Sequence, residues 1–347
     1  MTAEETAPQV NPILVREFRG GWVESLHRGA FAVSDGKRIV ASVGDIGRKV
    51  FPRSAIKLIQ ALPLIETGAA AAYGLGDIEL ALACASHGGE PAHVAAVEAW
   101  LERIGCTEAD LDCGPHMPSY PAAAEALVRL GAASRRIHNN CSGKHTGFLT
   151  VAKYLGAPTA GYDALSHPVQ QRVMAALSDL ALISASDLEL GIDGCGAPNF
   201  ALPLGALATA FARIADPAAL APVRHAGILR LRTAVKAQPF YLAGTGRLCT
   251  RIIESGADVI PKTGAEGVYV AALPSLKLGV ALKIDDGAGP AAQCVFMALL
   301  VSLRALAADA PLARTFLDQP ITNTQDKIVG RRQADMQLIS AAISANI

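Results

Sequence analysis

The chain has 347 residues, of which 51% are hydrophobic and 18% charged, and its formal net charge at pH 7 is zero. This length provides for one large domain or two closely packed ones with a substantial core. The balanced charge, with no dense basic stretch, argues against a nucleic-acid partner.

The sequence also bears on where the protein works. Residues 1–7 are acidic and hold no apolar core of signal-peptide length, and no apolar run reaches the ~18 residues of a membrane span. The seven cysteines are odd in number and irregularly spaced, which favours reduced thiols. We therefore expect a cytoplasmic protein that does not associate with membranes.

The N-terminal part is predicted to form strands. Short β-rich runs at 14–18, 22–26 and 30–33 are separated by glycines, and a hairpin turn at 34–37 leads to a return strand at 38–43. After Phe51-Pro52 the hydrophobic period becomes helical, and Pro63 is expected to kink or end that first helix.

A helix-rich middle follows, and strand signals then return. The predicted helices span 91–104, 121–130, 147–155, 167–181, 204–214, 222–236 and, more briefly, 244–253. Strands are predicted at 267–272 and 276–284, and a final helix at 291–307. The more polar stretch 322–347 is expected to form a tail or an oligomer contact.

Strand-forming segments thus come from both chain ends, 11–50 and 260–310, and enclose a helical middle, 54–255. Strands joined by tight hairpins predict an α+β fold (α/β in the broad sense) with a mainly antiparallel sheet flanked by helices. Because no internal repeat or clear linker interrupts the chain, we expect a single domain over 1–347.

Two separated motifs indicate acyl transfer. In Ser54-Ala55-Ile56-Lys57 the serine and lysine are about one helical turn apart, so they share a face, and an unprotonated Lys57 accepts the hydroxyl proton. Lys262-Thr263-Gly264 is the usual companion of such a serine in penicillin-binding proteins and serine β-lactamases. The simpler interpretation, an N-cap serine and a surface lysine, fits the first motif alone but not the pair.

Three further segments are rich in reactive side chains. The Cys84–Glu90 loop is either a tight turn or a site where Ser86 relays protons, and residues 138–145 form the densest polar cluster. The glycine-rich loop at 191–198 is either an ordinary turn or a close approach to a ligand. Two cysteines in such loops are too few to assign zinc, and Lys144 must lose its proton before it can be a third ligand.

Taken together, these motifs resemble the bacterial type II asparaginase family typified by the rhizobial enzyme. The resemblance is carried by segments 51–57 (FPRSAIK), 85–87 (ASH), 140–145 (NCSGKH), 193–196 (DGCG) and 261–264 (PKTG), of which 140–145 is the most specific. The segments run from early to late, so the resemblance covers nearly the whole chain.

The resemblance implies a homodimer whose fold is similar to serine β-lactamases and penicillin-binding proteins, and which hydrolyses L-asparagine to L-aspartate and ammonia. Two Ser–Lys pairs are implied, Ser54 with Lys57 and Ser86 with Lys262. The implied zinc ligands are Cys141, Lys144 and Cys195. The expected substrate-binding residues are Arg53, His145, Asp193 and Cys249.

One departure from the penicillin-binding pattern weakens a β-lactam or peptidoglycan substrate. The second motif of those proteins is Ser-x-Asn or Tyr-x-Asn, whereas this chain has Ser86-His87-Gly88. The absence of an export signal also disfavours a β-lactamase-like esterase or peptidase.

We expect Lys57 to deprotonate Ser54, which attacks the side-chain amide of asparagine. Two converging, partly desolvated lysines lower each other's pKa, which predicts an alkaline activity optimum. Asp193 is expected to bind the α-ammonium, and Arg53 or His145 the α-carboxylate. Zinc would organise this pocket and would not activate the nucleophile.

Two alternatives stay open at this stage. A glutaminase needs the same chemistry with one more methylene of room, which a pocket distinguishes by only ~1–3 kcal/mol. A catalytically silent protein that binds zinc or an amino acid is the other, although it would not need both Ser–Lys pairs.

Overall fold

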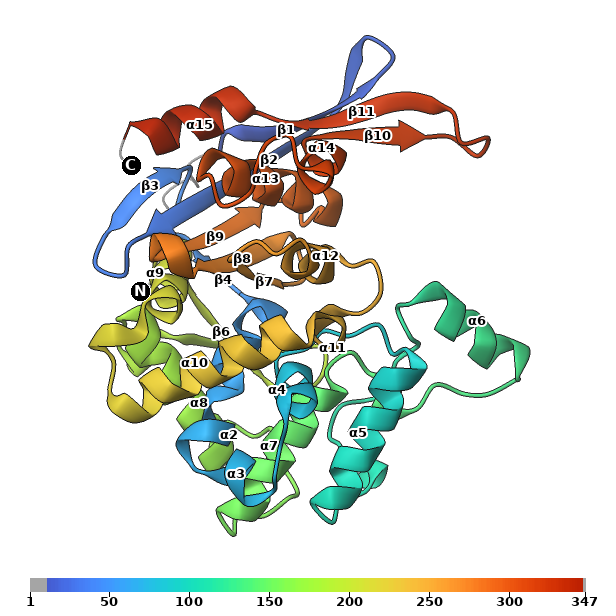
Figure 1. The fold of residues 1–347 in the computed structure, drawn as a ribbon, viewed down its shortest axis with the longest axis vertical. Helices are drawn as coiled ribbons and strands as arrows, with labels where there is room; N and C mark the ends of the chain where they lie inside the picture. Colours follow the sequence, from blue (N-terminus) through green and yellow to red (C-terminus); the bar gives the residue numbers. More distant parts are fainter. Residues whose placement is uncertain (1–10, 346–347) are drawn as a thin grey trace, which may run out of the picture. The chain divides into compact units, whose positions relative to one another are not determined.

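The computed structural model describes residues 11–345 (Figure 1). Contacts within the chain divide it into two compact units. Unit 1 comprises the described parts of 1–50, 202–215 and 264–347, and unit 2 comprises 51–201 and 216–263. The acidic segment 1–7, on which the expectation of no signal peptide rests, lies outside the described residues. The single domain over 1–347 stays a prediction.

Unit 1 is built on an antiparallel sheet whose hydrogen-bonded order is β10-β11-β1-β2-β9-β8, with β3 also beside β2. The prediction of a mainly antiparallel sheet drawn from both chain ends is therefore confirmed. The strands of unit 1 are β1 Ile13–Arg19, β2 Trp22–Ser34, β3 Ile39–Val43, β4 Lys49–Val50, β8 Val268–Leu273, β9 Leu278–Ile284, β10 Asp318–Thr322 and β11 Ile328–Ala334.

One long strand, β2, replaces the two short strands predicted at 22–26 and 30–33. The glycine between them, Gly29, does not break the strand, because it allows β2 to approach β9 closely. A Cβ atom at Gly29 would lie 2.4 Å from the backbone oxygen of Lys283. Glycine inside a strand here indicates a close backbone contact.

Helices cover the sheet of unit 1 because its central strands are hydrophobic on both faces. The buried pattern of β8 and β9 is nearly continuous, and α9 packs on β9, β2 and β8 while α13 packs on β11, β8 and β9. The helices of unit 1 are α9 Leu204–Ala215, α13 Gly289–Ser302, α14 Pro311–Leu317 and α15 Met336–Ser344, with a 3-10 turn η6 at Pro274–Leu276.

The stretch 322–347, expected as a tail or an oligomer contact, is mostly part of the folded unit. Strand β11 has β1 on one side and β10 on the other. Helix α15 buries Ile339 and Ile343. The apolar residues of α15 and the pairing of β11 together fix this segment, and residues 346–347 lie outside the description.

Unit 2 is mainly helical, in agreement with the predicted helical middle. Its α-helices are α1 Lys57–Gln60, α2 Leu62–Glu66, α3 Ala69–Ala72, α4 Asp77–Ala83, α5 Pro91–Arg103, α6 Pro121–Arg129, α7 Ser142–Tyr154, α8 Pro168–Ala181, α10 Pro222–Ala237, α11 Pro239–Ala243 and α12 Leu248–Glu254. The 3-10 turns are η1 Arg53–Ile56, η2 Glu108–Asp110, η3 Arg136–His138, η4 Ala185–Asp187 and η5 Pro217–Ala219. The strands are β5 Glu189–Ile192, β6 Pro198–Pro203, which runs on into unit 1, and β7 Ile260–Thr263.

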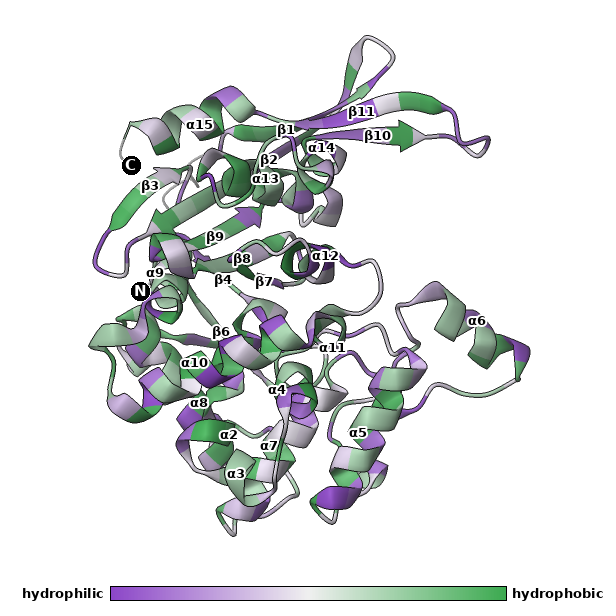
Figure 2. Cartoon of the chain, in the orientation of Figure 1, coloured by the Kyte–Doolittle hydropathy of each residue, from purple (hydrophilic) through white to green (hydrophobic). Residues whose placement is uncertain are grey.

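Two kinds of helix form unit 2. The buried residues of α10 recur every three or four positions, and in Figure 2 its polar residues appear as purple patches between green ones. Helix α7, by contrast, is buried from Ser142 to Ala152. Its two threonine hydroxyls bond within the helix, since Thr146 donates to the Ser142 oxygen at 2.9 Å and Thr150 to the Thr146 oxygen at 2.8 Å.

Helix α7 begins five residues before the predicted start at 147, because its polar first turn is buried against α4. Gly143 makes this approach possible, since a Cβ atom there would lie 2.5 Å from the Leu82 backbone oxygen. Among residues 11–345, no helix is both long enough and apolar enough to cross a membrane.

Candidate functional site

Ser54 lies in η1, directly before α1, in a turn with an unusual backbone. Arg53, the residue before it, has a φ of 53°, in the left-handed region that non-glycine residues seldom adopt. Residues held in such conformations cluster at functional sites. The Lys57 backbone N–H donates to the Ser54 carbonyl, which places the two residues about one turn apart as predicted, and Ser54 is half-buried.

The Lys57 side chain is fully buried and reaches the loop that follows α4. Its Nζ donates to Ser86 Oγ at 3.0 Å and to the backbone oxygens of Ala85 and Asn140 at 2.5 and 3.4 Å. Within residues 11–345 no hydrogen bond joins Lys57 to the Ser54 hydroxyl. The expected hydrogen bond between the Ser54 and Lys57 side chains is therefore not found among the described residues, because three other oxygens accept from the buried amine.

The loop from Cys84 to Glu90 is buried along its whole length, so its backbone needs partners inside the protein. Ser86 N–H donates to the Leu242 oxygen at 3.0 Å, and His87 N–H to the Asn140 oxygen at 3.3 Å. The His87 ring is within 3.0 Å of Ser142 Oγ. These contacts fix the Ser86 hydroxyl between its lysine partners.

Lys262 reaches the same hydroxyl from β7. Its Nζ donates to Ser86 Oγ at 2.9 Å and to the Thr263 oxygen at 3.0 Å. Burial, reinforced by repulsion from Lys57, lowers the pKa of Lys262 to about 7. The expectation that converging lysines lower a lysine pKa holds for Lys262.

Three of the four predicted catalytic residues thus form one centre, in which the Ser86 hydroxyl is hydrogen-bonded to the amines of Lys57 and Lys262. Ser54 lies one turn before Lys57, and its hydroxyl is not hydrogen-bonded to this centre within residues 11–345. A serine hydroxyl between two amines, one of them partly neutral near pH 7, can pass a proton from one lysine to the other. A lysine that is neutral at this pH can also serve as a general base for a serine nucleophile.

Two of the predicted substrate-binding residues contact each other. Arg53 Nε donates to Asp193 Oδ1 at 2.6 Å, and the same oxygen accepts from the Gly194 N–H at 2.8 Å. The two side chains are 29% and 13% exposed, so the pair is partly open to solvent. It presents a cation and an anion side by side.

The three predicted metal ligands also meet, in a buried cluster at the start of α7. Lys144 Nζ lies 3.0 Å from Cys195 Sγ, and Cys141 Sγ donates to Asn140 Oδ1 at 3.1 Å. A hydrogen bond from Cys141 and the nearby Lys144 charge lower the pKa of the Cys195 thiol. Burial opposes the charge on Lys144, but the Cys195 and Cys141 sulfurs outweigh it and raise the pKa of Lys144.

These residues fit zinc in part. Two soft thiol ligands and a nitrogen converge, as zinc prefers, but Lys144 is held as an ammonium by the Cys195 thiolate and must lose its proton to bind a metal. Among the described residues, no three His, Cys, Asp or Glu side chains are placed to hold an ion. Zinc at this cluster stays a prediction.

The other two predicted substrate-binding residues are buried. His145 is inside α7, where its Nδ1 lies 2.7 Å from the Tyr162 hydroxyl, and its Nε2 has no hydrogen-bond partner among residues 11–345. Burial lowers the pKa of His145. Cys249 lies on α12, where burial raises the pKa of its thiol and the nearby Lys262 charge opposes that rise.

A cavity of about 190 Å³ lies beside this centre, and sequence reasoning did not find most of its lining. Glu90, Tyr120, Thr245 and Arg247 face it, together with Gly88, which follows Ser86 by two residues. The sequence signals for this lining are the Cys84–Glu90 loop, which contains Gly88 and Glu90, and the two glycines that flank Thr245. Nothing in the sequence indicates that Glu90 and Thr245 meet.

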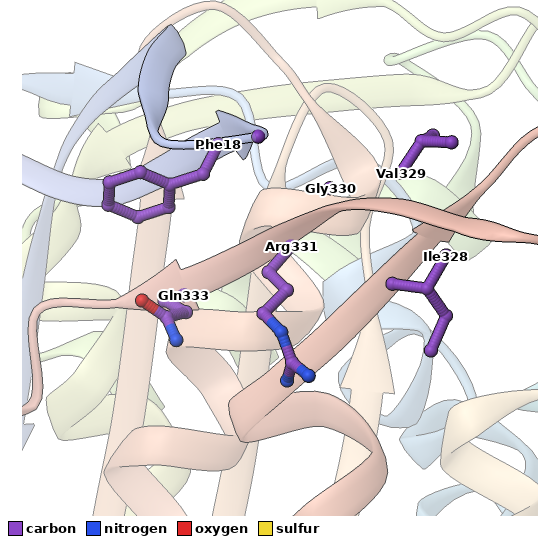
Figure 3. A pocket seen from close by; sticks show the side chains of 7 residues that line it. Phe18, Ile328, Val329, Gly330, Arg331 and Gln333 are labelled. Atoms are coloured by element: carbon purple, nitrogen blue, oxygen red, sulfur yellow. The ribbon is translucent and has the colours of Figure 1, made fainter.

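A second hollow, of about 320 Å³, lies in unit 1 beside β1 and β11, and Figure 3 shows the side chains of Phe18, Arg331 and Gln333 around it. Its other lining residues are Gly20, Ile328, Val329 and Gly330. This set contains no nucleophile, carboxylate or imidazole. Chemistry of the predicted kind is therefore supported in unit 2.

Comparison with known proteins agrees with the motifs. Among solved structures, a beta-lactamase from Mycobacterium bovis matches 80% of this chain and 95% of its own, with 15% identity and a TM-score of 0.39, and we draw nothing from so low a similarity. No curated protein sequence matches significantly. The family model for L-asparaginase II matches residues 15–334, nearly the whole chain. The chain belongs to the L-asparaginase II family.

Proposed function

We propose that this protein is an L-asparaginase, an amidohydrolase that converts L-asparagine to L-aspartate and ammonia through an acyl-enzyme. The observation that carries the proposal is the Ser86 hydroxyl bonded to the buried amines of Lys57 and Lys262, at 3.0 and 2.9 Å. Family membership supplies the class of substrate, an amide.

In the proposed reaction Ser54 is the nucleophile, because it is half-exposed whereas Ser86 is 6% exposed and held by both lysines. The Ser86 hydroxyl relays a proton between Lys57 and Lys262, whose pKa lies near 7. Neutral Lys57 then rotates toward Ser54 and accepts its hydroxyl proton.

The bonds change in two stages. Ser54 Oγ forms a bond to the amide carbon, and backbone N–H groups including that of Ser54 stabilise the oxyanion. The C–N bond then breaks as the nitrogen takes the former Ser54 proton from Lys57 and leaves as ammonia. Water then gives its hydroxyl to the ester carbon and a proton, by way of Lys57, to Ser54 Oγ, as the ester C–O bond breaks and L-aspartate leaves.

The Arg53–Asp193 pair suits the other end of the substrate. An α-amino acid carries a carboxylate beside an ammonium, and the pair offers a complementary charge to each, the Arg53 cation to the carboxylate and the Asp193 anion to the ammonium. We propose that the α-carboxylate binds Arg53 and the α-ammonium binds Asp193. His145 is buried and hydrogen-bonded to Tyr162, so in this proposal it stabilises the pocket without contacting the substrate.

Zinc, if bound, would be held by the Cys141 and Cys195 thiolates and the neutral amine of Lys144. It would supply a Lewis-acidic charge at the edge of the pocket. No step above runs through it. Metal analysis of the purified protein tests this proposal, as sedimentation equilibrium tests the predicted homodimer and cell fractionation the predicted cytoplasmic location.

The deciding experiment measures ammonia release from L-asparagine and L-glutamine by the wild type, Ser54→Ala and Ser86→Ala, with mass spectrometry of acid-quenched enzyme. We expect activity on asparagine, loss of at least a hundredfold in both variants, and an aspartyl group on Ser54. An aspartyl group on Ser86 would reverse the roles of the serines.

The controls separate the remaining alternatives. Turnover of glutamine in preference to asparagine would make the protein a glutaminase. A folded wild type that releases ammonia from neither substrate, but binds L-aspartate in calorimetry, would be a silent binder and would contradict the proposal.

A further inference from the structure

Glu90, which the proposed reaction does not use, is a buried side chain that accepts two hydrogen bonds from Thr245. It is 6% exposed and lies at the end of the loop that carries Ser86. Its Oε1 accepts the backbone N–H of Thr245 at 2.8 Å, and its Oε2 accepts the Thr245 hydroxyl at 2.6 Å. Charge-assisted bonds of this kind are about twice as strong as neutral ones.

On the Glu90 side of the contact between Glu90 and Thr245, three stacked aromatic rings fix the backbone. Glu90 N–H donates to His93 Nδ1 at 3.3 Å, and His93 Nε2 lies 3.0 Å from the Phe240 oxygen. The His93 ring stacks between His87 and Phe240, with centroids 4.9 and 4.4 Å away. Burial lowers the pKa of His93, which favours its neutral ring, and the hydrogen bonds to the Glu90 side-chain oxygens come from Thr245.

On the Thr245 side of the same contact, the residue before Thr245 must be a glycine. Gly244 has a φ of 102°, and a Cβ atom there would lie 2.6 Å from Glu90 Oε1. Its carbonyl accepts the Thr250 hydroxyl at 2.7 Å. The backbone at 244–245 is therefore pressed against the carboxylate and tied to α12, which begins three residues later.

This contact shapes the cavity beside the proposed catalytic centre. Gly88, Glu90, Thr245 and Arg247 all line the 190 Å³ cavity. Arg247 is exposed; its backbone oxygen accepts the Arg251 N–H at 3.0 Å, and within residues 11–345 no hydrogen bond or ion pair is found for its side chain. Its charge is close enough to Lys262 to disfavour the ammonium form there.

We infer that Glu90 is a positioning residue that, by holding Thr245, fixes the loop 244–247 and its Arg247 as a wall of the substrate cavity beside Ser86 and Lys262. Glu90 does not touch the reacting atoms. The inference rests on the proposed function for its kinetic consequences, but the contact between Glu90 and Thr245 can be tested without turnover.

The pH dependence follows from the charges around Lys262. The groups that face it are the cations of Lys57 and Arg247 and the thiols of Cys249, Cys141 and Cys84. If the loop loosens and Arg247 moves away, one repulsive charge is lost. The pKa of Lys262 then rises, and the acid limb of kcat/KM moves to higher pH.

The experiment uses Glu90→Gln in the full chain, which keeps the side-chain volume but places an amide donor against a Thr245 donor. We expect faster hydrogen exchange in peptides covering 243–249, a ten- to hundredfold loss of kcat/KM on L-asparagine, and the acid limb at higher pH. Arg247→Met is expected to move the acid limb in the same direction without changing exchange at Thr245.

Matched variants separate positioning from general stability. Thr245→Ser keeps both donors and is expected to behave as the wild type, whereas Thr245→Val loses the hydroxyl and is expected to fall between the wild type and Glu90→Gln. Glu125→Gln, whose exposed partner is Arg129 on α6, is the control for removing a carboxylate. If Glu90→Gln does not fold, the Thr245 pair carries the test.

Two results would overturn the inference. One is unchanged exchange at 243–249 in Glu90→Gln, and the other is faster exchange with kcat/KM and its acid limb as in the wild type. A wild type without activity would contradict the proposed function instead, and the exchange data would still decide whether Glu90 holds the loop.

Discussion

Lys262 shows how a buried lysine serves chemistry at the expense of stability. The residue is 2% exposed and its amine shares the Ser86 hydroxyl with that of Lys57, and burial with this repulsion brings the pKa of Lys262 from 10.5 to about 7. Below the ordinary lysine pKa, the unfolded chain holds a proton that the folded protein holds less tightly. The folded state is therefore penalised as pH falls from about 10 to about 7, and the penalty is constant below that.

We therefore predict that at pH 6 to 7 the free energy of unfolding of Lys262→Met exceeds that of the wild type by on the order of a few kcal/mol. The variant should accordingly unfold at a higher urea concentration. The difference should shrink as pH approaches 10. The same variant should lose at least a hundredfold in kcat, since the proton acceptor is gone.

Urea unfolding at pH 6, 8 and 9.5 measures the effect on stability, with Lys37→Met, on an exposed turn, as the control. Equal unfolding free energies for wild type and Lys262→Met at pH 6 would show that Lys262 is not destabilised in the folded protein. An unchanged kcat would show that it is not the proton acceptor.

Some pairs of site residues could be predicted from the sequence, because the motifs that contain them are recognisable by their spacing. Ser86 with Lys262, and Cys195 with Lys144, meet as the resemblance implied. The Lys57 contact with Ser86 could not be predicted, because it depends on how the buried loop 84–90 returns to α1. Spacing shows which residues share a helix face, but not which distant oxygen satisfies a buried amine.

Among the secondary-structure elements, helix α7 positions several of the predicted site residues. It brings Cys141, Lys144 and His145 into the interior, and it can do so only because Gly143 lets it touch α4. Any side chain at Gly143 would push the two helices apart and move the loop that carries Ser86.

We predict that Gly143→Ala lowers the unfolding free energy by about 1–3 kcal/mol, since the new methyl group meets the backbone oxygen of Leu82 and no flexible side chain can yield. Gly227→Ala in α10 is the matched control, because its methyl group would make an ordinary contact of 3.5 Å with Leu62. That control is expected to gain up to about 1 kcal/mol from helix propensity.

Thermal and urea unfolding of the two variants checks this expectation. Equal stability of Gly143→Ala and Gly227→Ala would mean that the α7–α4 contact relaxes without cost. Reduced kcat in Gly143→Ala with normal stability would place its effect on the site alone.

For the whole molecule, the C-terminal segment 322–347 is where the structure differs from one of the two alternatives predicted, a tail, whereas an oligomer contact stays a prediction. Polar residues favoured a tail, but alternate residues of a strand inside a sheet can be polar when one face stays open to solvent. Strand β11 lies between β1 and β10, with Arg331 opposite Phe18 and Gln333 opposite Arg16. Removing it would leave β1 with an unpaired edge.

We predict that truncation after Lys327 prevents folding of unit 1, because it removes β11 and the buried face of α15. Ile328→Ser, which changes a side chain that is 59% exposed, is the control and is expected to fold normally. Soluble yield and the cooperativity of thermal unfolding by circular dichroism measure both. A truncated chain that melts cooperatively like the wild type would contradict the prediction.

The sequence by itself determined the antiparallel sheet drawn from both chain ends, the helical middle, and the motifs of the L-asparaginase II family. Local patterns determine these features, since hydrophobic period, turn residues and motif spacing are set by neighbours along the chain. Only the tertiary structure decided that both lysines meet at Ser86, that Arg53 pairs with Asp193, and that Glu90 holds Thr245. These contacts join residues up to 176 positions apart, and they form because buried polar groups must find partners wherever the packed chain provides them.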